Sequence, residues 1–186
     1  MTKQQDKDQR SAWLKTDRLY LSNWSFADAE AAFAIYGDPI AMRFMHPNYP
    51  VVDVAAMRTR LGEIIERNKS FADGFGSWPI FRRDNDMLIG AVLLKPLPDS
   101  TQIEVGWHLA RSEWGNGYAT EAGRAALQHG FHALALKTIF AVVDPENTAS
   151  MAVCRRLGMT HLGQTDQFYD RSLEYFSIGQ AMVATG

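Results

Sequence analysis

The sequence IEVGWHLARSEWGNGYATEA, residues 103–122, joins a strand pattern to a helix pattern. In its first seven residues apolar side chains alternate with other ones, which is the period of a β-strand. Glu104 and His108 fall on the same face of that strand, so a carboxylate and an imidazole share one surface. The last residues begin a longer run, residues 118–136, in which apolar side chains recur at helical spacing. The sequence therefore predicts a strand followed closely by a long helix.

Between that strand and that helix, Gly115 and Gly117 stand one residue apart. Glycine permits positive φ and lets a ligand approach the backbone without meeting a Cβ atom. A helix N-terminus adds unpaired N–H groups and partial positive charge, so the junction is either a tight turn or a phosphate cradle. It is not a P-loop, which needs Lys and then Ser or Thr where Tyr118 and Ala119 stand. It is not the dinucleotide fingerprint either, because Thr120 replaces the third small residue.

The rest of the chain predicts a mixed α+β order. Ser25 and Asp28 have the spacing of a helix cap before an alanine-rich run that ends at Gly37, and Asp53 is placed to cap a second helix. Further strands are predicted at residues 19–22, 78–82, 88–94, 138–143, 159–164 and 173–178, with a short helix at 148–157. Residues 1–15 are expected to form a polar arm, and residues 16–186 a single domain.

Composition excludes several classes of protein. With 186 residues, 46% hydrophobic and 22% charged, the chain fits one ordinary globular domain, and its net charge of −2 gives no general attraction to nucleic acid or anionic membrane. The single cysteine, Cys154, excludes an internal disulfide and a cysteine-built metal cluster. His129 and His132 share a helix but lack an obvious third ligand, so no metal site is predicted. A polar N-terminus and the lack of a long apolar run make a cytoplasmic location the expectation.

Four stretches in order along the chain resemble the GCN5-related N-acetyltransferase (GNAT) superfamily, in particular its ribosomal-protein N-terminal acetyltransferase (RimJ/RimL-like) branch. They are TDRLYLSNW (16–24), the quoted residues 103–122, VDPENTAS (143–150) and CRRLGM (154–159). The resemblance implies a GNAT fold: a twisted, mostly antiparallel sheet flanked by helices. It also implies a V-shaped split in the sheet, between the strands that end near Leu109 and near Val143.

The same resemblance implies that acetyl-CoA, as co-substrate and without a metal, lies in that split. Its pyrophosphate is expected on the backbone amides of Trp114, Gly115, Asn116, Gly117, Tyr118 and Ala119, with Thr120 adding a hydroxyl donor. The pantetheine arm is expected to pair with the backbone of Trp107, His108 and Leu109, with Asn147 on its far side. Arg155 or its neighbour Arg156 either binds the CoA 3′-phosphate or simply supplies the cationic last turn of a helix.

The implied reaction is direct attack on acetyl-CoA by a primary amine, of a protein N-terminus or a small molecule, in a ternary complex. Cys154 stands where many members of the family have the tyrosine that protonates the leaving thiolate. Ser150, one helical turn away, is our candidate for the residue that donates or relays that proton. The alternative is that Ser150 only takes part in the hydrogen bonds of the first helical turn. The missing tyrosine leaves a catalytically silent acyl-CoA-binding or sensing module as the alternative.

Glu104 is the candidate base, with Asp166 and Glu174 weaker, unless Glu104 is solvated or only holds the substrate ammonium. Residues 42–50 and 165–172 are expected to select the acceptor. A homodimer is expected from the family resemblance.

Overall fold

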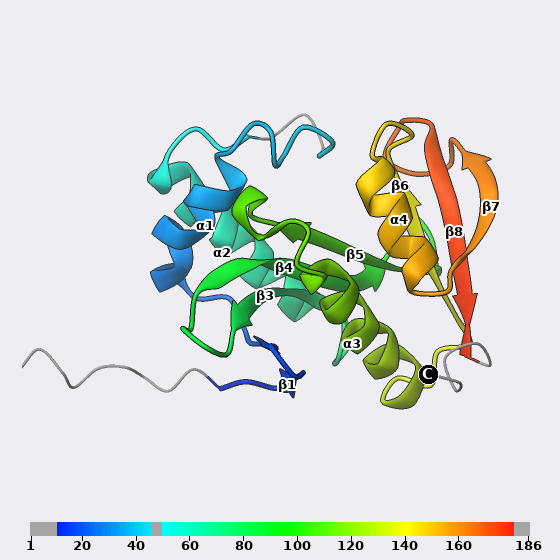
Figure 1. Ribbon diagram of the computed structural model, residues 1–186, viewed down its shortest axis with the longest axis horizontal. Helices are drawn as coiled ribbons and strands as arrows, with labels where there is room; N and C mark the ends of the chain where they lie inside the picture. The colour runs from blue at the N-terminus through cyan, green and yellow to red at the C-terminus, as the bar shows by residue number, and fades with distance from the viewer. Residues whose placement is uncertain (1–10, 46–49, 181–186) are drawn as a thin grey trace, which may run out of the picture.

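The computed structural model describes residues 11–45 and 50–180, and its centre is one eight-stranded sheet (Figure 1). Along the sheet the strands follow the order β1-β2-β3-β4-β5-β6-β8-β7. Their bounds are β1 Leu14–Lys15, β2 Leu19–Leu21, β3 Gly76–Arg82, β4 Leu88–Pro96, β5 Ile103–Leu109, β6 Thr138–Val143, β7 Thr160–Thr165 and β8 Leu173–Gly179. All neighbouring pairs are antiparallel except β5 and β6, which are parallel. The predicted mixed α+β class and mostly antiparallel sheet are confirmed.

The α-helices cover both faces of this sheet. They are α1 (Ala29–Tyr36), α2 (Val54–Ser70), α3 (Tyr118–His132) and α4 (Thr148–Arg156), with 3-10 turns at Phe26–Asp28 and Arg111–Glu113. One buried cluster joins α1 and α2 to Phe81 and Ala91, and the other joins α3 and α4 to Val92 and Val105. Because neighbouring residues of a strand point to opposite faces, Ala91 and Val92 identify two separate cores. The pair α1–α2 and the pair α3–α4 therefore lie on opposite sides of the sheet.

The helix starts follow the predicted caps. The Ser25 hydroxyl accepts a hydrogen bond from the Ala27 amide, while the Asp28 carboxylate accepts one from the Ser25 amide, which forms a capping box before α1. At α2, the Asp53 carboxylate accepts from the Ala56 amide at 2.7 Å.

The predicted end of the long helix was wrong: α3 stops at His132, four residues before Leu136. Ala135 has a left-handed backbone with φ +51°, and the Leu136 amide donates back to the Gly130 carbonyl at 3.0 Å. This closure satisfies a helix-terminal carbonyl and turns the chain into β6. Apolar spacing persists beyond His132 because Leu134 and Leu136 still pack on the core, not because the helix continues.

The predicted split in the sheet is present between β5 and β6. The two strands are paired in register only at Glu104 and Phe140, whereas β6 is paired with β8 along all six of its residues. Figure 1 shows β6, β8 and β7 with α4 as a group on the right, separate from β3, β4 and the helices α1 and α2 on the left. One edge of β5 beyond Glu104 therefore lies open toward the gap.

The sheet begins earlier than the predicted domain boundary at residue 16. Leu14 and Lys15 form β1, paired with Leu21 and Tyr20 of β2. Residues 1–10 of the expected arm lie outside the described part of the chain. Within the described part, no helix is both long and apolar enough to cross a bilayer.

Candidate active site

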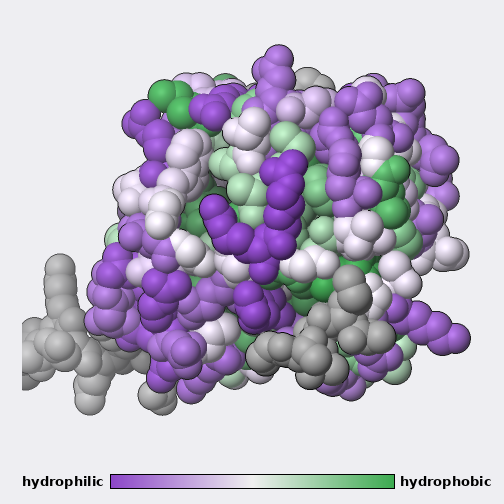
Figure 2. All heavy atoms as spheres, turned by 45° about the vertical axis from the view of Figure 1, so that its right-hand side comes forward, coloured by the Kyte–Doolittle hydropathy of each residue, from purple (hydrophilic) through white to green (hydrophobic). Residues whose placement is uncertain are grey.

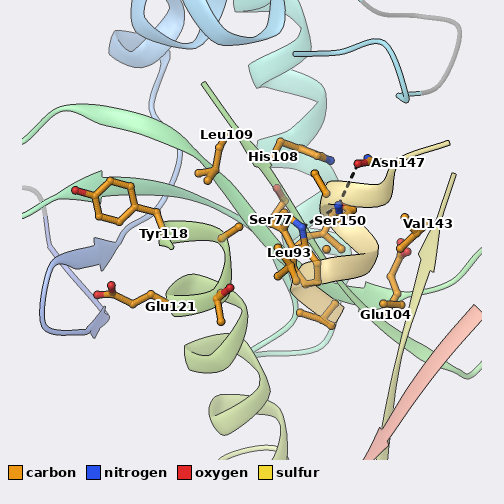
Figure 3. Close-up of a pocket in the computed structure, with 18 of the residues that line it drawn as sticks. Ser77, Leu93, Glu104, His108, Leu109, Tyr118, Glu121, Val143, Asn147 and Ser150 are labelled. Carbon is orange, nitrogen blue, oxygen red and sulfur yellow. Dashed lines mark hydrogen bonds between the residues drawn. The ribbon is translucent and has the colours of Figure 1, made fainter. Parts of the chain in front are cut away.

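A large cavity occupies the split between β5 and β6. Its volume is about 1800 Å³, above the 300–1,000 Å³ that is typical of small-molecule sites. Figure 3 shows the residues that line it from β5 and from the starts of α3 and α4. One side of α2, on the other face of the sheet, lines it as well. In Figure 2 strongly hydrophilic residues surround a hollow in the middle of the molecule's face, next to apolar patches. The cavity is large enough for a long ligand together with a second reactant.

The glycine turn opens onto this cavity at the start of α3. Gly115 and Gly117 have φ of +81° and +80°, and Gly117 is the N-cap residue of the helix. A Cβ at Gly115 would meet nothing within 4 Å, so the space before it is open. Thr120 has a buried hydroxyl with no hydrogen-bond partner among the described residues. An anion that accepts from these amides and from this hydroxyl would satisfy them, so the turn fits a pyrophosphate.

Two of the backbone groups that were predicted to bind the cofactor already have hydrogen-bond partners within the protein. The Trp114 amide donates to the Arg111 carbonyl at 3.3 Å, so it is the least available amide of the predicted set. The Trp114 indole N–H donates to the Leu109 carbonyl at 3.1 Å. The open edge of β5 that remains for a pantetheine arm therefore centres on Trp107 and His108.

A network that the sequence did not reveal holds the turn in place. The Arg18 guanidinium donates to the Glu121 carboxylate at 2.7 Å and to the Asn116 carbonyl at 2.9 Å, and it lies 4.6 Å from the centre of the Tyr118 ring. Burial raises the pKa of Glu121, but hydrogen bonds from Thr16 and Arg18 outweigh burial and leave this pKa below its usual value. The acidic residue four positions after Gly117 was the only local signal for this network.

Ser150 lies in the cavity beside the β5 edge. Its hydroxyl oxygen accepts from the Trp107 indole at 3.1 Å, and its amide donates to the Asn147 side chain at 3.1 Å, as the dashed line in Figure 3 marks. Since its oxygen accepts from Trp107, its own proton is free to be donated elsewhere. The amide is capped by Asn147, so helix capping does not use the Ser150 hydroxyl.

Cys154 shares the helix face of Ser150 but lies in the core. It is fully buried, and burial raises the pKa of its thiol to about 12. It does not line the cavity. The position of the family's tyrosine is therefore occupied by a residue that faces protein.

Glu104 is at the closed end of the split and is held by two donors. It is 5% exposed, and its Oε1 accepts from Lys95 Nζ at 2.5 Å and from the Tyr169 hydroxyl. Lys95 Nζ also donates to the Tyr169 oxygen at 2.8 Å. Burial, followed by the Glu104 charge, raises the pKa of Tyr169, so its phenol stays neutral. The alternative of a solvated Glu104 is thus contradicted.

His108 lines the same side of the cavity as Glu104, as the strand pattern predicted. Its ring meets that of Tyr36 edge-on, with centroids 6.1 Å apart. Burial, and then the charge of Lys95, lower the pKa of His108 to about 4. Its imidazole is neutral at physiological pH.

The structure places only one of the two candidate arginines, Arg155 and Arg156, in the lining of the cavity. Arg156, not Arg155, lines the cavity, together with Arg124 of α3. Consecutive residues of a helix point about 100° apart, so only one of the two arginines can face the split. Arg155 instead contributes to lowering the pKa of Glu174 on β8, behind the hydrogen bonds from Gln164 and His161.

The two segments expected to select the acceptor meet the cavity in part. Tyr169 and Arg171 from residues 165–172 line it, and Arg171 donates to Asp144 and, at 3.3 Å, to the Phe44 carbonyl. Residues 46–49 of the other segment lie outside the described chain. Glu174 and Asp166, the weaker base candidates, do not line the cavity.

The described residues contain no group of three or more His, Cys, Asp or Glu side chains that could hold a metal ion. His129, one of the two helix histidines, contacts the Gly74 carbonyl at 3.0 Å and packs against Trp13 and Trp78.

Residues 18–160 match the family model described as acetyltransferase (GNAT) domain. The chain is 28% identical over 150 residues to the uncharacterized N-acetyltransferase YnaD of Bacillus subtilis, covering 81% of this chain and 84% of that one. It is 30% identical over 157 residues to the uncharacterized N-acetyltransferase YoaA of the same organism, covering 83% and 86%.

Solved structures share the fold. A GNAT-family acetyltransferase from Bacillus anthracis superposes with a TM-score of 0.76 at 24% identity, covering 90% of this chain and 98% of that one. The microcin C7 self-immunity acetyltransferase MccE, in complex with acetyl-CoA and AMP, has a TM-score of 0.73 at 15% identity, covering 88% and 93%. The ribosomal L7/L12 acetyltransferase RimL, in complex with coenzyme A, has a TM-score of 0.72 at 17% identity, covering 88% and 95%.

Proposed function

The chain belongs to the GNAT acetyltransferase family, and we propose that it transfers the acetyl group of acetyl-CoA to a primary amine by direct attack in a ternary complex. The observation that carries the proposal is the split between β5 and β6, which opens a cavity from the glycine turn of α3 to the buried carboxylate of Glu104. Such a cavity has room for a cofactor and an acceptor from opposite faces of the sheet.

Acetyl-CoA supplies the activated acetyl thioester, and this chain's residues bind and orient it. The amides of Gly115 to Ala119, with the Thr120 hydroxyl, hold the pyrophosphate at the positive end of α3. The open edge of β5 at Trp107 and His108 pairs with the pantetheine arm as an added strand would, and Asn147 lies on its far side. Arg156 and Arg124, which line the cavity, bind the 3′-phosphate in this proposal.

Proton movement is assigned to two groups. Glu104 takes a proton from the acceptor ammonium, directly or through water, because an amine must be unprotonated to attack a thioester. Ser150 relays a proton to the departing sulfur: it gives up its hydroxyl proton and takes the one that the newly acetylated nitrogen loses, while the Trp107 indole keeps its oxygen oriented. Neither step uses Cys154, whose thiol is buried.

The acceptor is either a protein N-terminus, as in the RimJ/RimL-like branch, or a small-molecule amine. The motif at residues 103–122 supports that branch. The burial of Cys154 at the tyrosine position favours the rival proposal, a binding module without catalysis.

Release of free CoA during incubation with acetyl-CoA and a panel of amines tests the proposal. The panel should contain peptides with free N-termini, polyamines and amino acids, and mass spectrometry should identify a product that is heavier by one acetyl group. Thermal stabilisation by acetyl-CoA without turnover on any amine would select the silent module.

A further inference from the structure

One side of α2 points arginines into the cavity. Arg60, Ile64 and Arg67 follow one another at spacings of four and three residues, so they share a face of the helix, and all three line the cavity. Because α2 packs on the face of the sheet opposite α3, these side chains approach from the side away from the glycine turn. That side is where an acceptor enters if the cofactor lies on the turn.

The acceptor side of the cavity carries more positive than negative charge. Among the described residues its lining includes four cationic side chains, namely Arg60, Arg67, Lys95 and Arg171. The carboxylates among these lining residues are Glu104 and Asp144, and each is already paired, with Lys95 and Arg171 respectively. The chain as a whole has a net charge of −2, so this excess is local.

On the acceptor side, Arg67 is the cation that the protein itself does not neutralise. It has no carboxylate partner among the described residues, whereas Arg60 contacts Glu63 at 3.1 Å. Arg43 also has no carboxylate partner among the described residues, but its guanidinium lies over the rings of Phe44 and Trp114, next to the glycine turn. Arg67 lines the same cavity as Tyr169, whose hydroxyl donates to Glu104. The pKa of Tyr169 is raised first by burial and then by Glu104, and the charge of Arg67 acts in the opposite direction.

The phosphates of CoA do not account for this excess. They have the amides at the start of α3, and Arg124 and Arg156 of α3 and α4 line the cavity on that face. A favourable interaction with the dipole of α2, near whose C-terminus Arg67 lies, does not explain why Arg67 lines the cavity either. Lys69 occupies the same last turn, favours the helix dipole equally and pairs with Glu66 outside the cavity.

We propose that the amine acceptor carries a negatively charged group, a carboxylate or a phosphate, which Arg67 binds while the amine faces Glu104. This inference rests on the proposed acetyl transfer to an amine and names the class of amine. The guanidinium forms two parallel hydrogen bonds with such a group, which fixes the distance between the anion and the reacting nitrogen. A neutral amine of the same shape would leave Arg67 unpaired beside the site.

Matched acceptors test this directly. We would compare β-alanine with its amide, O-phosphoethanolamine with ethanolamine, and the tripeptide amide Ala-Asp-Ala with Ala-Asn-Ala, at concentrations expressed as unprotonated amine. The anionic member of at least one pair should have a kcat/KM about tenfold or more above its neutral partner, as expected for a charge-assisted hydrogen bond. The small molecules and the peptides separate a free metabolite from a protein N-terminus as the source of the anion.

Three variants assign the preference to Arg67. Arg67→Gln should abolish it through a raised acceptor KM with little change in kcat, and Arg67→Lys should restore part of it. Lys69→Gln removes a cation from the same turn outside the cavity and should leave the preference unchanged. Thermal unfolding confirms that each variant folds.

The outcomes are distinct. Equal or faster turnover of the neutral members, or a preference that survives in Arg67→Gln, overturns this inference and leaves acetyl transfer to amines standing. No turnover on any amine, with acetyl-CoA still bound, overturns the proposed function and the acceptor class with it.

Discussion

Among single residues, Ser150 has the most direct consequence for catalysis. Its hydroxyl accepts from Trp107 and keeps its own proton available in the cavity. Ser150→Ala should therefore lower kcat by roughly 10²-fold with little change in the affinity for acetyl-CoA. Steady-state kinetics and calorimetric titration measure the two quantities separately.

Cys154→Ala is the matched control for Ser150→Ala, because it changes the same helix face without touching the cavity. It should reduce stability and leave kcat unchanged. A loss below threefold in both variants would mean that water or the thiol of CoA handles the proton.

Glu104 is expected to act on the acceptor. Glu104→Gln should reduce kcat/KM by roughly 10²-fold or more near neutral pH. The loss should shrink as pH rises, because the amine then loses its proton without help. Rate profiles from pH 6 to 9.5 measure this, and a uniform loss confined to the acceptor KM would instead assign Glu104 to binding.

Tyr169→Phe separates the charge of Glu104 from its hydrogen bonding. It removes one donor to Oε1 and keeps the pair with Lys95. We expect it to be milder than Glu104→Gln, which leaves Lys95 without its partner and also destabilises the fold.

His108 makes stability depend on pH. Its pKa is about 4 in the folded protein, against 6.5 for an ordinary histidine, so between these values the unfolded chain binds more protons than the folded one. Stability should therefore fall as pH drops from about 6.5 to about 4. The full shift would correspond to about 3 kcal/mol, and because the ring is partly exposed to the cavity we expect on the order of 1–2 kcal/mol.

Urea unfolding at pH 7.5, 6 and 5 measures the slope. His108→Gln should make the free energy of unfolding depend less on pH in this range, while the contributions of the other titrating groups stay the same. An identical slope in both proteins would mean that His108 has the same pKa in the folded and unfolded states.

At the level of elements, the turn before α3 needs positive φ at its two glycines and is also the proposed binding site of the pyrophosphate. Gly117→Val should abolish acetyl-CoA binding in calorimetric titration, since a β-branched side chain fills the cradle and resists φ of +80°. The strain itself should cost about 1–3 kcal/mol of stability.

Gly158 provides a control with the same strain. It has φ of +79° just after α4 and does not line the cavity. Gly158→Val should lose a similar amount of stability and bind acetyl-CoA as the unmodified protein does. Unchanged binding in folded Gly117→Val would remove the phosphate cradle from the site.

At the scale of the whole molecule, the cavity lies between the group of β6, β8, β7 and α4 and the rest of the sheet. A ligand bound in it would bridge the two parts, so it should stabilise the complete fold. Acetyl-CoA at 100 times its dissociation constant should add about 2.7 kcal/mol, which corresponds to a rise in Tm of about 5–10 °C for a chain of this length. Differential scanning fluorimetry measures the rise. Gly117→Val should show none, and a rise that persists in it would place the ligand elsewhere.

The sequence by itself determined the elements and several of their faces. Alternation along residues 103–109 put Glu104 and His108 on one surface, and Ser25, Asp28 and Asp53 marked the helix starts. Helix and strand periods and end caps involve residues at most a few positions apart, so a linear sequence contains them in full. The family motifs located the glycine turn for the same reason.

Only the tertiary structure decided which side chains contact one another across long distances in the sequence. Glu104 meets Lys95 nine residues before it and Tyr169 sixty-five after it, and Arg18 reaches the start of α3 from the bend just before β2. It also turned Arg156 rather than Arg155 toward the cavity, ended α3 at His132 and buried Cys154 on the same helix face as Ser150, which lines the cavity. These outcomes depend on how separate elements pack, because a local pattern states which residues share a face and not what that face will meet.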